Sequence, residues 1–77
     1  MAESNLKKRS VLVGGVRTSV SLENEFWESL REIAAMRGLS VSELATQIKT
    51  AAGAGNFTSA IRVYVLDTYR RSLRREP

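Results

Sequence analysis

Alternating apolar and polar residues run through the segment from Arg9 to Leu22. Within Val16–Leu22 every second residue is aliphatic or β-branched, which is the two-residue period of a half-buried strand. Ser10–Val13 is a shorter β-branched stretch, and Gly14-Gly15 between the two stretches is a two-residue turn signal. The pattern predicts an N-terminal hairpin that pairs residue 13 with 16, 11 with 18 and 9 with 20.

This register gives the hairpin one apolar face and one polar face. Directly opposed residues of an antiparallel pair share a face, so Val11 and Val13 join the apolar residues of the second strand. Leu12, opposite Arg17, is the apolar residue on the wrong side. The polar face carries Lys8, Ser10, Arg17, Ser19 and Ser21.

Two helices are predicted after the hairpin. Apolar residues from Glu23 to Arg37 follow the 3.6-residue period of an amphipathic helix, and Gly38 is a suitable left-handed C-cap. A capping box then opens the second helix: the Ser40 hydroxyl would accept from the Glu43 N–H, and the Glu43 side chain would return to the Ser40 N–H. Gly53 ends this helix.

A third helix is predicted from Asn56 or Thr58, which are alternative N-caps, to about Arg71. Apolar residues lie on almost all of its sides, so we expect it to be largely buried. The β-branched residues at 61, 63 and 65 would also fit a strand, but the cap and the length favour a helix. The chain closes on a basic segment with arginines at positions 70, 71, 74 and 75.

Composition excludes several classes of chemistry. The chain has 77 residues, which is one domain, and it contains neither cysteine nor histidine. Disulfides, thiolate and imidazole metal sites and the commonest general base are therefore absent, and we expect no enzyme activity, no metal and no cofactor. A chain this short buries only about 60% of its unfolded surface, so we expect it to gain stability by forming a homodimer.

Charge and hydropathy suggest the kind of partner. The net charge is +4, and residues 1–22 and 50–77 are basic while residues 23–49 are acidic. Basic surface of this density favours a polyanion, nucleic acid before an anionic membrane, although it also serves solubility. No apolar run is long enough to span a membrane and no leader opens the chain, so we expect a cytoplasmic protein.

The order and spacing of these segments resemble the ribbon-helix-helix family, which includes the Arc and Met repressors. The resemblance rests on an alternating strand, an amphipathic helix and a Gly-x-Ser link, found here as Arg17–Leu22, Leu30–Ala34 and Arg37–Leu44. It implies a mostly α fold with a short β-ribbon and an obligate homodimer, whose ribbon enters the major groove of double-stranded DNA. A transcriptional repressor is the function that it implies.

The same resemblance implies roles for individual residues. Outward strand side chains would contact bases, and these are Arg17, Ser19 and Ser21. The start of the second helix would bind a phosphate through Ser40, Val41 and Ser42, and the basic N-terminal residues Lys7, Lys8 and Arg9 would bind phosphates as well. The shared dimer core would consist of Val16, Thr18, Val20, Leu22, Trp27, Leu30, Ile33, Leu44 and Ile48.

Two features depart from the family's minimal pattern. The first strand of the predicted hairpin would make the dimer's sheet four-stranded and about 14 Å wide, whereas the major groove is about 12 Å wide. The third helix is additional, and it leaves open a dimeric protein-interaction module, an adaptor or an antitoxin, that binds a partner protein through this helix. The expected organisation is a disordered basic arm over residues 1–8, a hairpin and ribbon-helix-helix core over 9–52, and a third helix with a basic end over 53–77.

Overall fold

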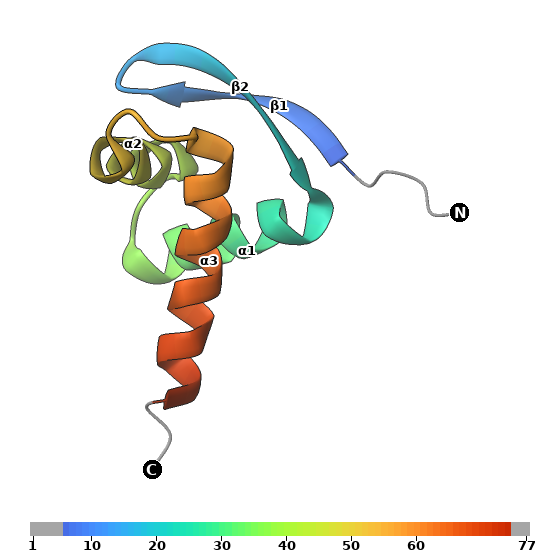
Figure 1. Ribbon diagram of the computed structural model, residues 1–77, viewed down its shortest axis with the longest axis vertical. Coiled ribbons are helices and arrows are strands. Elements are labelled where there is room, and N and C mark those ends of the chain that lie inside the picture. The colour runs from blue at the N-terminus through green and yellow to red at the C-terminus, as the bar shows by residue number, and fades with distance from the viewer. Residues whose placement is uncertain (1–5, 75–77) are drawn as a thin grey trace.

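The computed structural model describes residues 6–74, in which an antiparallel hairpin is followed by three helices (Figure 1). The hairpin lies across one end of the molecule, and the last helix runs from there toward the opposite end (Figure 1). The predicted fold class, mostly helical with a short ribbon, an N-terminal hairpin and a third helix, is confirmed. The elements are β1 (Leu6–Val13), β2 (Val16–Glu23), α1 (Asn24–Arg37), α2 (Val41–Ala52) and α3 (Phe57–Arg74).

The hairpin has the predicted register. Val13 pairs with Val16 and Leu12 with Arg17, and the two turn residues Gly14 and Gly15 have φ values of 58° and 84°. A side chain at either position would strain this turn, because L-residues other than glycine rarely adopt positive φ. The glycine pair therefore fixes the register, and the register fixes which side chains face away from the helices.

The first strand is longer than its hydrophobic pattern indicated. It begins at Leu6, with Lys7 opposite Leu22 and Lys8 opposite Ser21. The expectation of a disordered arm over residues 1–8 is therefore wrong for its last three residues, and residues 1–5 lie outside the described part. Backbone groups of β2 extend the ladder whatever the side chains are, so polar residues can lie in a strand that periodicity does not reveal.

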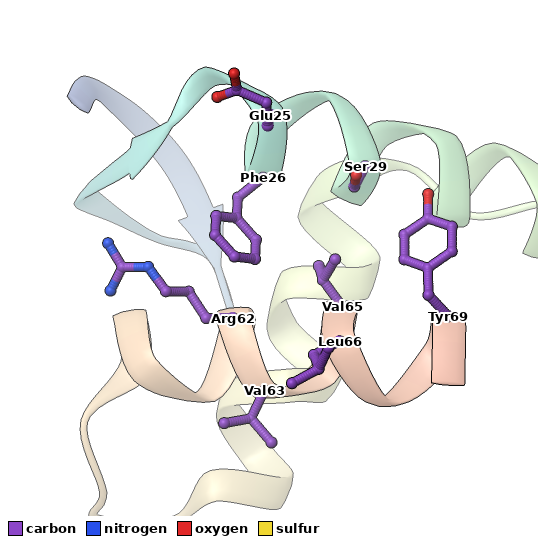
Figure 2. Close-up of a pocket in the computed structure, with 8 residues that line it drawn as sticks. All are labelled: Glu25, Phe26, Ser29, Arg62, Val63, Val65, Leu66 and Tyr69. Carbon is purple, nitrogen blue, oxygen red and sulfur yellow. The ribbon is translucent and has the colours of Figure 1, made fainter. Parts of the chain in front are cut away.

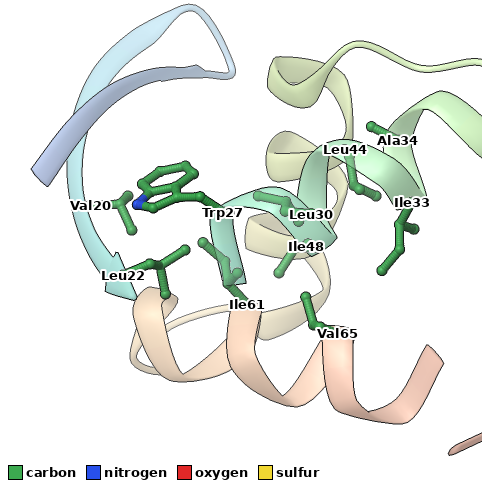
Figure 3. Packing of buried hydrophobic residues seen from close by; sticks show 10 residues of the cluster. All are labelled: Val20, Leu22, Trp27, Leu30, Ile33, Ala34, Leu44, Ile48, Ile61 and Val65. Atoms are coloured by element: carbon green, nitrogen blue, oxygen red, sulfur yellow. The ribbon is translucent and has the colours of Figure 1, made fainter. Parts of the chain in front are cut away.

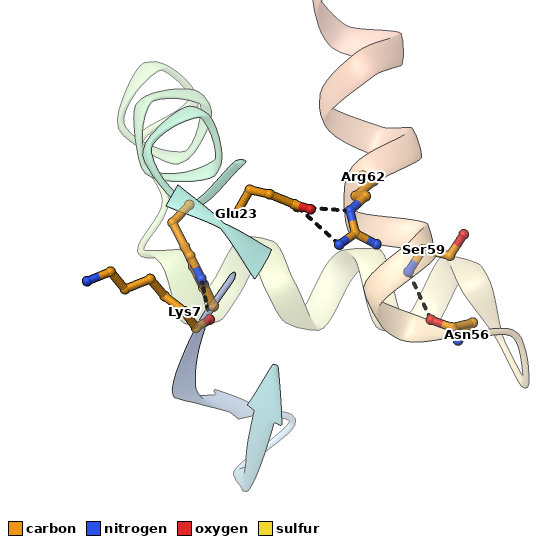
Figure 4. A network of polar contacts seen from close by, with 6 residues as sticks. Lys7, Glu23, Asn56, Ser59 and Arg62 are labelled. Atoms are coloured by element: carbon orange, nitrogen blue, oxygen red, sulfur yellow. Dashed lines mark hydrogen bonds and ion pairs between the residues drawn. The ribbon is translucent and has the colours of Figure 1, made fainter. Parts of the chain in front are cut away.

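The helix ends follow local chemistry. Glu23 is still extended, with φ −63° and ψ 150°, so α1 begins at Asn24, and it ends at Gly38 in the left-handed region with φ 72°. The Asn56 Oδ1 accepts a hydrogen bond from the Ser59 N–H at 2.9 Å (Figure 4). Of the two predicted caps for α3, Asn56 is therefore the one that the structure uses.

Helix α3 is less buried than predicted. Only Ile61 and Val65 are buried along it, whereas Val63 is 62% and Leu66 55% exposed. The spacing of four residues places Ile61 and Val65 on one face, and about 100° per residue turns Val63 and Leu66 away from it. The strand alternative for this segment is wrong, and one side of α3 leaves apolar residues uncovered.

The core lies between the inner face of β2 and the three helices (Figure 3). Trp27 lies beneath the hairpin, and its Nε1 donates a hydrogen bond to the Lys7 carbonyl at 3.1 Å. Most residues predicted for a shared dimer core are already buried within one chain, but Thr18 is only half-buried and Val16 is exposed. The buried ones are Val20, Leu22, Trp27, Leu30, Ile33, Leu44 and Ile48.

An ion pair joins the end of β2 to α3. The Arg62 guanidinium lies 3.0 Å from the Glu23 carboxylate (Figure 4). A backbone hydrogen bond and this guanidinium hold the pKa of Glu23 below its usual range. The pair is about one-third exposed, so its effect is to orient the two elements more than to stabilise the fold.

Candidate nucleic-acid interface

The outward face of the hairpin carries the predicted base-contacting residues. Arg17 and Ser19 are exposed and Ser21 is half-buried, all on the strand face that points away from the helices. Lys8 lies opposite Ser21, and the exposed side chain of Leu12 lies opposite Arg17. The result is a polar surface with a cation from each strand and with hydroxyl groups between them.

The three basic residues at the start of β1 do not act as one group. Alternation places Lys8 on the outward face and places Lys7 and Arg9 on the other face. The Arg9 guanidinium lies 5.4 Å from the centre of the Trp27 ring, a cation–π arrangement. Only Lys8 therefore shares a face with Arg17, Ser19 and Ser21, while Arg9 lies at the edge where β1 meets the helices.

The start of α2 has the predicted capping box. The Ser40 hydroxyl accepts from the Glu43 N–H at 3.0 Å, and the Ser40 N–H donates to the Glu43 carboxylate at 2.8 Å. The Leu44 N–H bonds to the Ser40 carbonyl at 3.0 Å. Among residues 6–74 the N–H groups of Val41 and Ser42 have no acceptor, so two first-turn donors and the positive end of the helix dipole remain available to an anion.

Side-chain hydrogen bonds fasten the start of α2 to β1. The Ser42 hydroxyl donates to the Leu12 carbonyl. The Thr46 Oγ1 accepts from the Gly14 N–H at 2.9 Å and donates to the Ser42 carbonyl at 2.8 Å. The side chain of Ser42 is therefore a link between strand and helix, and only its backbone N–H remains for the predicted phosphate contact. These links place the helix start beside the edge of the hairpin.

A groove of about 330 Å³ runs between β1 and the starts of α1 and α2. Both Arg9 and Arg31 line it, together with Trp27, Val41 and Ser42. Sequence reasoning did not single out Arg31 as a functional residue. The sequence signal for Arg31 is its spacing of four residues from Trp27. Residues i and i+4 share a helix face, so this spacing predicts that Arg31 lies on the same side of the helix as Trp27. Two arginines thus line the same groove as the two residues whose N–H groups are available.

The described residues contain no group of three or more acidic residues positioned to hold a metal ion. None of the helices within residues 6–74 is both long enough and apolar enough to cross a membrane.

Comparison with known proteins identifies the family. A solved structure of an uncharacterized protein from Bordetella pertussis Tohama I superimposes with a TM-score of 0.73 at 37% sequence identity. The match covers 94% of this chain and 62% of that protein, so the chain spans less than two thirds of its length. No curated protein matches. The family model of the ribbon-helix-helix domain matches residues 6–69, and the chain therefore belongs to the ribbon-helix-helix family.

Proposed function

We propose that the protein binds a specific double-stranded DNA sequence as a homodimer and acts as a transcriptional repressor. Ribbon-helix-helix proteins typically dimerise and bind DNA. The observation that carries the proposal is the link between Ser42 and Leu12, which holds the start of α2, with its two available N–H groups, beside β1 at the edge of the hairpin. One surface thus offers side chains suited to base edges next to a site suited to a backbone phosphate.

The free edge of β2 supports the dimer. Helix α2 is linked to β1, whereas no backbone hydrogen bond within residues 6–74 joins β2 to anything other than β1. Val16 faces the same way as the buried Val20, yet it is 64% exposed in a single chain. Antiparallel pairing of two β2 strands about a two-fold axis would place Val16 opposite Val20 or Leu22 of the partner subunit and would cover it.

Such pairing gives the sheet strand order β1-β2-β2-β1, with both β2 strands at its centre. Four strands span about 14 Å, which exceeds the roughly 12 Å of the major groove. The central pair would therefore contact bases through Arg17, Ser19 and Ser21, and each β1 would lie over a phosphate rim. Lys8 on β1 is placed to meet that rim.

Each phosphate would lie in the groove between β1 and α2. The N–H groups of Val41 and Ser42 would donate to it, and Arg9 and Arg31 would neutralise it. The carboxylate of Glu43 lies close to the same N–H groups, because it accepts from Ser40. The negative charge of the Glu43 carboxylate would therefore repel a phosphate bound at this position.

Binding across a salt series tests the proposal. Affinity for random and for selected duplexes should fall steeply with salt, with a log–log slope of about −0.9 for each phosphate contact, and the selected duplex should bind on the order of 10³-fold more tightly. Absence of binding at low salt would contradict the proposal and would favour a dimeric adaptor or antitoxin. That alternative keeps the extra helix α3 as its supporting feature, and it predicts capture of a protein partner instead.

Arg31→Ala should weaken binding to every sequence by a similar factor. A phosphate contact carries no base information, so the ratio of selected to random affinity should stay constant while the salt slope becomes shallower by about one unit per subunit. Titrations of both duplexes at several salt concentrations measure this. Arg71→Ala is the control, because Arg71 is paired with Asp67 on α3. Equal salt slopes for the two variants would show that Arg31 contacts no phosphate.

Glu43→Gln should strengthen binding. Glutamine can keep the capping-box hydrogen bond to the Ser40 N–H, and the change removes the carboxylate charge beside the phosphate position. We expect affinity for selected and random duplexes to rise about two- to fivefold, the range that one exposed charge interaction provides. Thermal melting should show a small loss of stability, since an acidic residue in the first turn favours the helix. Unchanged or weaker DNA binding would place the phosphate elsewhere.

A further inference from the structure

An uncovered apolar surface runs along α3 on the side that faces α1. A groove of about 450 Å³ separates the two helices, and Phe26, Leu66 and Tyr69 line it (Figure 2). Leu73 continues this line one turn further and is 73% exposed. We call Leu66, Tyr69 and Leu73 the α3 stripe. The proposed DNA contacts do not use this stripe.

We infer that the α3 stripe is a second contact region of the homodimer, in which it packs against the α3 stripe of the partner subunit. The inference rests on the homodimer of the proposed function and adds to it an interface that a ribbon followed by two helices would lack. The third helix would then stabilise the dimer instead of binding a different protein.

Surface area is the first reason. The edge of an eight-residue strand is about 27 Å long and about 5 Å wide, so pairing the β2 edges covers on the order of 140 Å² per subunit. Stable protein interfaces bury about 800 Å² per partner, and obligate ones bury more. A further apolar contact is therefore needed, and the groove supplies one that begins where β2 ends, because Arg62 lines it and pairs with Glu23.

Symmetry determines how the two α3 helices would run. A two-fold axis that leaves both outward sheet faces on the same side must pass through the sheet rather than lie in its plane. Helix α3 runs away from the hairpin toward the far end of the molecule (Figure 1). The axis and α3 therefore follow a similar direction, and the two α3 helices would lie side by side and roughly parallel.

Charge complementarity favours the same arrangement. On one flank of the α3 stripe the Tyr69 hydroxyl donates to the Glu32 carboxylate at 3.4 Å. On the other flank helical geometry places Arg70 and Arg74 about 40° and 80° from Leu66. Within residues 6–74 neither arginine has an acidic partner. An axis parallel to the helices sets each flank against the opposite flank of the partner, so Glu32 would meet the arginines. A perpendicular axis would set like charges together.

Substitution of the stripe tests the inference. Leu66→Glu should raise the dimer dissociation constant by at least about 30-fold in sedimentation equilibrium, as expected for loss of a central apolar contact. Met36→Glu is the control, because Met36 is 83% exposed on α1 and lies outside the groove. Far-ultraviolet circular dichroism should be unchanged in both variants. A Leu66→Glu protein that dimerises as tightly as the control would overturn the inference. That result is the one expected if the α3 stripe binds a different protein instead.

Charge exchange tests the parallel arrangement. Glu32→Arg alone and Arg70→Glu with Arg74→Glu should each weaken the dimer about threefold or more, and the three changes together should restore it. A triple variant that dimerises less tightly than either parent would overturn the pairing of Glu32 with the arginines.

The outcomes separate this inference from the proposed function. If Leu66→Glu leaves the dimer intact while a charge at Val16 dissociates it, the ribbon dimer stands and the α3 contact is wrong. If Leu66→Glu dissociates the dimer but the native protein binds no DNA, the α3 contact stands and the proposed function is wrong.

Discussion

Val16→Asp should separate the dimer and lower DNA affinity by at least about 100-fold. Val16 is exposed in a single chain, so a carboxylate there leaves the core of that chain intact. In the paired ribbon the same position lies opposite an apolar residue of the partner subunit, where an unpaired charge is costly. Loss of the second subunit then removes one of two linked binding surfaces, and linkage of this kind contributes about 10²-fold or more.

Sedimentation and thermal melting would follow the effect of Val16→Asp. The native protein should show a melting midpoint that rises with concentration, whereas the variant should be a folded monomer with a midpoint independent of concentration. Met36→Asp provides the matched control at another exposed apolar residue. Val16→Thr keeps a β-branched side chain and should keep the dimer. A dimeric Val16→Asp protein with normal DNA affinity would refute pairing through β2.

Arg17→Ala should remove sequence preference without harming the fold. Arg17 is exposed on β2, which would be a central strand of the proposed ribbon, and a guanidinium can bond two acceptors of guanine at once. We expect the selected duplex to lose about 1–3 kcal/mol of binding free energy, or roughly 5- to 150-fold in affinity. Random duplex should lose only the small part of its affinity that comes from the positive charge of Arg17. The melting midpoint should stay close to that of the native protein, since no described contact depends on this side chain.

Lys8→Ala is the comparison for Arg17→Ala. Lys8 shares the outward face but belongs to β1, over the proposed phosphate rim. Its loss should weaken selected and random duplexes alike and make the salt dependence shallower. If Lys8→Ala removed sequence preference and Arg17→Ala did not, the assignment of β2 to the centre of the ribbon would be wrong.

Sequence reasoning succeeded where short-range chemistry decides the structure. Two adjacent glycines determine the hairpin turn, and the turn then determines the register for all pairs from Val13 and Val16 outward. The capping box depends only on Ser40 and Glu43, which are three residues apart, so it too could be predicted. These features need no knowledge of how distant segments pack.

It failed where packing over long sequence separations decides. The Ser42 hydroxyl donates a hydrogen bond to the Leu12 carbonyl, thirty residues away, and no local sequence pattern predicts that contact. Arg31 shares a groove with the start of α2 only because the fold brings α1, β1 and α2 together there. The exposed side of α3 was missed because a run of apolar residues indicates burial on all sides. Within one chain only the side of α3 that carries Ile61 and Val65 is buried.

Selection of duplexes from a random pool, followed by sequencing, tests the central claim most directly. A two-fold symmetric ribbon that reads bases through Arg17, Ser19 and Ser21 predicts enrichment of an inverted repeat, with two equivalent half-sites related by the same symmetry as the dimer. Selection carried out with Arg17→Ala should lose the positions that the arginine contacts. A pool that shows no enriched sequence, or an enriched sequence without two-fold symmetry, would contradict specific DNA recognition by a homodimer.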